Sequence, residues 1–67
     1  MPYIHIDWVS GQGDERRDEV AKRVTHAVNE ITGIALTDIW VVFRDIEAKE
    51  WYVGDRSVAD RRAGKAG

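Results

Sequence analysis

The chain has 67 residues, a formal net charge of −2 and no cysteine. This length suffices for one domain over residues 1–67, and without cysteine there is no disulfide and no thiol nucleophile. The mixed charge gives no electrostatic case for a nucleic-acid or membrane partner. No apolar run approaches the roughly 20 residues of a membrane span, and the N-terminus lacks a signal-peptide pattern. We expect a cytoplasmic protein with no cofactor. The two histidines, His5 and His26, lie far apart in sequence and indicate no metal site.

A strand is predicted at the N-terminus. In the segment YIHIDWV, residues 3–9, the apolar residues Ile4, Ile6 and Trp8 fall on one face and polar residues fall on the other. This period of two is typical of a β-strand.

A helix is predicted after a loop with two glycines. Asp14 and Glu15 suit a first helical turn, because negative charge is favourable at the positive end of the helix dipole. Apolar residues then recur at helical spacing and form one stripe: Val20, Val24, Ala27, Val28 and Ile31. Gly33 stands where a left-handed C-terminal cap is expected.

Residues 39–43 are a continuous apolar run of β-forming residues. Such a run predicts a second strand that is covered on both faces, as in parallel sheets. Further on, residues 51–55 suit a short strand or hairpin ending in a turn, and residues 57–60 resemble a helix start. The tail, residues 56–67, is rich in Arg, Ala and Gly and is expected to be partly mobile.

The predicted fold class is α/β, with a single β-α-β unit of parallel strands and a short C-terminal hairpin. A helix of about 18 residues is long enough for a parallel crossover, which is right-handed in nearly all cases. One helix covers only one face of the two-stranded sheet, so the other face must meet another subunit. A chain of this length also buries only about 60% of its unfolded surface and usually needs further support. We therefore expect a homo-oligomer that associates through its sheet.

This layout, with a proline directly after the initiator Met, resembles the 4-oxalocrotonate tautomerase family of the tautomerase superfamily. Asp14 and Glu15 resemble the helix start of that family, and the segment from Trp40 to Asp55 resembles its second strand, polar loop and aromatic–glycine hairpin. The resemblance covers residues 2–55. It implies a β-α-β subunit that dimerises into a four-stranded sheet and assembles further, commonly to a hexamer. Dimer and trimer remain open.

The resemblance also implies an isomerase, a keto–enol tautomerase that acts on a 2-oxo acid with Pro2 as general base and acid. A proline at the mature N-terminus is a secondary amine. An apolar pocket near cations disfavours its charged form and lowers its pKa toward neutrality, where a base is most useful. Met1 must be removed, because a peptide-bonded proline nitrogen is not basic. The structural alternative is that Pro2 merely begins a strand, where proline is tolerated.

The substrate-binding positions that the resemblance implies fall on Gln12, Trp40 and Trp51. Family members carry arginines at the first two positions, to grip carboxylates, so both anion clamps are missing here. Trp51 takes the place of an aromatic residue that walls the pocket beside the amine. Arg44 is the candidate replacement cation. Each residue has a structural alternative: solvent exposure for Arg44, and packing within or between subunits for the tryptophans.

Two other functions remain open. Some relatives use the same amine to dehalogenate or hydrate unsaturated acids, but no obvious water-activating carboxylate stands beside Pro2. A non-catalytic oligomeric binding module on the same scaffold is favoured by the missing arginines. The tautomerase is the function that we predict.

Overall fold

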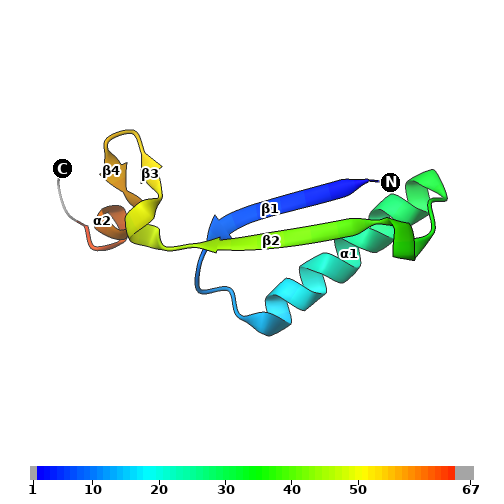
Figure 1. Ribbon diagram of the computed structural model, residues 1–67. Coiled ribbons are helices and arrows are strands. Elements are labelled where there is room, and N and C mark those ends of the chain that lie inside the picture. Colours follow the sequence, from blue (N-terminus) through cyan, green and yellow to red (C-terminus); the bar gives the residue numbers. More distant parts are fainter. Residues whose placement is uncertain (1, 65–67) are drawn as a thin grey trace.

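The computed structural model describes residues 2–64 of the chain (Figure 1). Its elements follow in the order β1 (Tyr3–Val9), α1 (Asp14–Thr32), a 3-10 turn (Leu36–Asp38), β2 (Trp40–Ile46), a 3-10 turn (Ala48–Glu50), β3 (Tyr52–Val53), β4 (Arg56–Ser57) and α2 (Val58–Arg62). Strands β1 and β2 pair in parallel, and β3 and β4 form an antiparallel hairpin. The predicted α/β fold, a β-α-β unit with a C-terminal hairpin, is confirmed.

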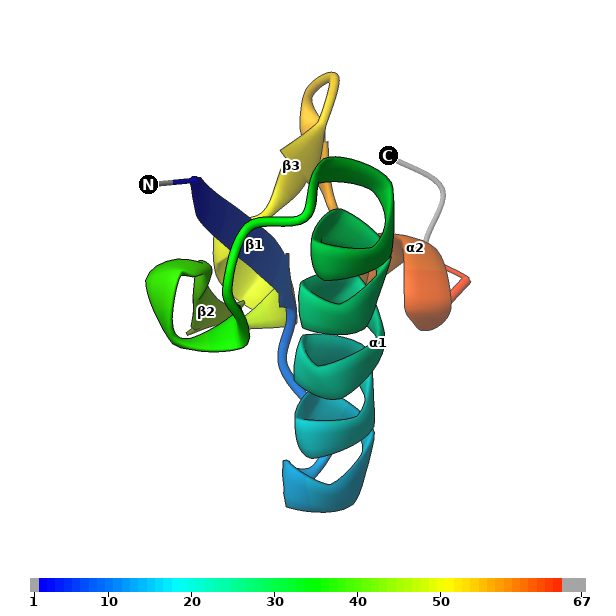
Figure 2. The same ribbon diagram turned by 90° about the vertical axis from the view of Figure 1, so that its right-hand side faces the viewer.

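The parallel register sorts the side chains of β1 and β2 onto two faces. Ile4 pairs with Val41 and Ile6 pairs with Phe43. These four are half-buried, and their burial places them on the side that α1 covers. Figure 2 shows that α1 lies on one side of the two strands. The opposite side, which we call the open face, includes Tyr3, His5, Asp7, Trp40, Val42 and Arg44, all of them exposed.

Helix α1 ends as predicted. Gly33 adopts the left-handed conformation with φ 76°, and its N–H donates to the Asn29 carbonyl at 2.8 Å. This closes the last turn, and glycine is favoured at such a position because it has no Cβ.

The predicted apolar stripe of α1 is only partly confirmed. Val20, Val24 and Val28 are half-buried, but Ala27 and Ile31 are exposed, Ile31 to 85%. The half-buried set also includes Arg17, Ala21 and Thr25, so Ala27 lies at the margin of the covered side. Ile31 shares the side of Val20 and Val24 but stands in the last turn of α1, which ends at Thr32.

Regular elements extend into the region predicted as a tail. The Ser57 hydroxyl accepts a hydrogen bond from the Asp60 N–H at 3.1 Å and caps α2, which confirms the helix start predicted at residues 57–60. The Val58 N–H donates to the Trp51 carbonyl at 2.7 Å and joins α2 to the hairpin. The rest of that tail, residues 65–67, and Met1 lie outside the described residues.

The described part of the chain buries very little. Ile39 is its only buried apolar side chain. The radius of gyration is 15.7 Å, whereas a compact domain of this length has about 11 Å, because the hairpin and α2 extend away from the β-α-β unit (Figure 1). Within residues 2–64, no helix combines the length and apolar character that crossing a bilayer requires. The exposed large apolar residues of the described part are Tyr3, Ile31, Leu36, Trp40, Val42, Tyr52 and Val53.

Candidate functional site

Pro2 and Trp40 lie together at the amino end of the sheet. The Pro2 carbonyl accepts a hydrogen bond from the Trp40 N–H at 3.0 Å, and Pro2 is half-buried. Tyr3 is the register partner of Trp40, and both side chains are more than half exposed, to 61% and 53%. The start of β2 thus fixes the backbone of Pro2, and aromatic residues flank it in sequence and across the sheet.

Gln12 and Trp51 lie toward the opposite end. Gln12 follows β1 and Trp51 follows β2 and its 3-10 turn, and the carboxyl ends of parallel strands share one end of a sheet (Figure 1). Strand β1 has seven residues with a rise of about 3.3 Å each, so its whole length separates Pro2 from Gln12. A single copy therefore does not bring the predicted site residues together.

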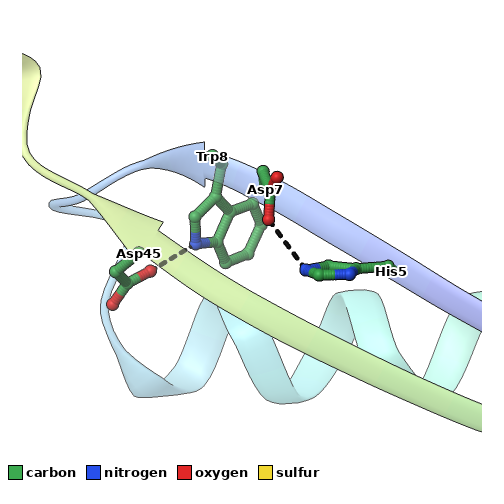
Figure 3. A network of polar contacts seen from close by, with 4 residues as sticks. All are labelled: His5, Asp7, Trp8 and Asp45. Carbon is green, nitrogen blue, oxygen red and sulfur yellow. Dashed lines mark hydrogen bonds and ion pairs between the residues drawn. The ribbon is translucent and has the colours of Figure 1, made fainter. Parts of the chain in front are cut away.

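Arg44 belongs to the open face and to neither end. Its register partner is Asp7, whose Oδ1 lies 2.8 Å from His5 Nε2 (Figure 3). The Tyr3 ring stacks on His5 with centroids 6.1 Å apart and planes at 10°. Arg44 forms no ion pair with any residue between 2 and 64. It is an exposed cation beside a histidine–carboxylate pair, far along the strand from Pro2.

A groove of about 280 Å³ lies where β1 leads into α1, and the sequence analysis did not predict it. Its lining is Trp8, Gln12, Arg16, Glu19, Val20 and Arg23. Within α1, Arg16, Glu19, Val20 and Arg23 are linked by steps of three or four residues, the spacing that places side chains on one side of a helix. That spacing is the signal that could have revealed the groove.

The Trp8 side chain, which forms one wall of the groove, is fixed by two residues that do not line the groove. Its Nε1–H donates to Asp45 Oδ1 of β2 at 2.6 Å (Figure 3). Its ring centroid lies 5.0 Å from that of Phe43, at a tilt of 38°. With its donor already bonded, the indole presents an apolar and π-electron surface to the groove.

A second hollow, of about 380 Å³, runs along β2. Its lining is Arg17, Val41, Val42, Phe43 and Asp45. The Arg17 guanidinium lies 3.2 Å from the Asp14 carboxylate, so its charge is compensated. None of the predicted site residues lines this hollow.

Comparison with known proteins identifies the family. The family model described as tautomerase enzyme matches residues 2–61. A probable tautomerase of Lactiplantibacillus plantarum is 32% identical over 63 residues, which cover 94% of this chain and 98% of that protein. The 2-hydroxymuconate tautomerase of Bacillus subtilis is 28% identical, with coverage of 90% and 97%. The crystal structure of TomN, a 4-oxalocrotonate tautomerase homologue in the tomaymycin biosynthetic pathway, superposes with a TM-score of 0.88 at 29% identity and covers 92% of this chain and 95% of that one. The chain therefore belongs to the tautomerase family.

Proposed function

We propose that the protein is an isomerase that interconverts the enol and keto forms of a 2-oxo acid, with Pro2 as general base and acid. The observation that carries the proposal is the setting of Pro2, which is half-buried at the start of β1 and fixed through its carbonyl by the Trp40 N–H. Membership of the tautomerase family supports keto–enol chemistry. The activity named for the Bacillus subtilis relative supports an unsaturated hydroxy or oxo acid as substrate class.

The proposed reaction moves one proton between two atoms of the substrate. With Met1 removed, Pro2 is a secondary amine whose lone pair takes the proton of the enol hydroxyl. The C–O bond becomes a carbonyl, and the ammonium returns the proton to the carbon that was part of the C=C bond. The amine is regenerated and no other reactant is consumed. Partial burial disfavours the ammonium and keeps the amine available as a base.

In this proposal the site is assembled from more than one copy. Pro2 and Trp40 lie at one end of the sheet and Gln12 and Trp51 lie toward the other. An aromatic wall for Pro2 is therefore contributed by Trp51 of a second copy. The open face and the extended hairpin offer the contact surfaces, which supports a homo-oligomer, with a hexamer favoured by the family resemblance.

The test is the rate of phenylenolpyruvate ketonisation across neutral pH, measured for the native protein and for Pro2→Ala. We expect a clear rate with a single ionisation near neutrality, and a fall of about a hundredfold or more in the variant, the usual contribution of a general base. Equal rates in both proteins, or no rate above buffer, would contradict the proposal and favour the non-catalytic binding module.

The intact mass of both proteins is the control for this experiment. Loss of Met1 is the expected result, because only then is the Pro2 nitrogen an amine. Retained Met1 would rule out the tautomerase and the amine-dependent dehalogenase or hydratase together.

A further inference from the structure

Arg16 differs from the other arginines of α1 because no carboxylate neutralises it. The others are paired within the helix: Arg17 with Asp14 at 3.2 Å and Arg23 with Glu19 at 2.8 Å. Among residues 2–64, the polar contact of Arg16 is with the side-chain oxygen of Gln12, 3.5 Å from Nη1. A neutral amide leaves the guanidinium its full charge and most of its five donors. Arg16 is therefore available to an external anion.

The groove that Arg16 lines carries one uncompensated positive charge. The Glu19 and Arg23 charges in the same lining cancel, because these side chains are paired. The Trp8 indole forms an apolar wall whose only donor is bonded to Asp45. The groove volume of about 280 Å³ is just below the range of ligand pockets, which begins near 300 Å³, so only a small ligand fits. A single cation beside an aromatic wall in a small groove suits a small planar acid with one carboxylate.

We propose that Arg16 binds the carboxylate of the substrate and that Gln12 is the positioning residue that holds its guanidinium. The inference rests on the proposed function and specifies its substrate class as planar monocarboxylic acids. The guanidinium fork donates two parallel hydrogen bonds to the carboxylate, and the body of the acid packs on Trp8. The reacting amine belongs to a second copy, because Pro2 of the same chain lies at the far end of β1.

The closing experiment is a binding measurement that does not depend on turnover. Isothermal titration calorimetry compares trans-cinnamate, a planar monocarboxylic acid, with its neutral isostere trans-cinnamamide, on the full-length native protein and its variants. We expect the native protein to bind the acid roughly tenfold or more tighter than the amide, because a hydrogen-bonded charge pair is lost with the amide. Arg16→Ala should weaken binding of the acid by a similar factor and leave binding of the amide unchanged.

Three further variants separate a binding role from a structural one. Arg16→Lys should bind the acid with intermediate affinity, because it keeps the charge and loses the fork. Gln12→Ala should weaken binding of the acid less than Arg16→Ala does. Arg17→Ala is the matched control. It removes the same charge from the same turn of α1, but Arg17 lines the other hollow. This variant should therefore bind the acid as the native protein does.

Equal affinity for acid and amide in the native protein would overturn the inference, as would an Arg16→Ala variant that binds the acid unchanged or loses both ligands equally. The outcome is independent of the Pro2 test. A tautomerase that depends on Pro2 but is indifferent to Arg16 contradicts this inference alone. Binding of the acid that depends on Arg16, without any turnover, contradicts the proposed function alone.

Discussion

At the residue scale, one hydrogen bond sets the orientation of Trp8. Its Nε1–H donates to Asp45 Oδ1 at 2.6 Å, so Trp8→Phe keeps an aromatic ring but loses the bond. We expect the free energy of unfolding to fall by about 1 kcal/mol, the usual net contribution of such a bond, as measured by urea unfolding at fixed protein concentration. Asp45→Asn keeps an acceptor oxygen and should lose less. If Trp8→Phe matched the native protein, the bond would not stabilise the fold.

At the scale of elements, the end of α1 depends on a glycine. Gly33 has φ 76°, and a Cβ at this position would meet nothing within 4 Å. The cost of Gly33→Ala is therefore one of backbone conformation rather than of a clash, and we expect a loss of about 1 kcal/mol in urea unfolding. Gly33→Asn should lose less, because asparagine tolerates the left-handed region. An alanine variant as stable as the native protein would indicate that the cap relaxes to another conformation.

How far the sequence predicts this structure depends on whether a feature is local. The strand at residues 3–9 and the cap at Gly33 follow from periodicity and backbone preference, which act between near neighbours. Ile31 has the spacing of the half-buried valines but stands in the last turn of α1 and is exposed, because helical spacing does not show where along its length a helix is covered. The groove at Arg16 likewise depends on the packing of residues of α1 beside Trp8 of β1. The sequence places Arg16 and Arg17 in the first turn of the helix, shortly after Gln12, but it does not show that Arg17 is paired with Asp14 whereas Arg16 contacts Gln12.

At the scale of the whole molecule, the open face is the surface that the chain leaves uncovered. Val42 lies on it opposite His5 and is 42% exposed. If another copy covers this face, Val42→Asp places an unpaired charge in an apolar contact, which is costly. We expect sedimentation to show dissociation or unfolding.

The control for this variant is Lys22→Glu, which also adds negative charge but at an exposed position of α1. It should sediment as the native protein does. A folded, unchanged oligomer for Val42→Asp would show that the open face is not the interface between copies.

A chain whose described residues bury a single apolar side chain, Ile39, has little with which to offset the loss of chain entropy by itself. When the missing apolar contacts come from other copies, folding obeys mass action. The midpoint of thermal unfolding then rises with protein concentration, and a newly made chain reaches its stable state only after it meets others. The abundance of the protein would itself set the fraction of chains that are folded.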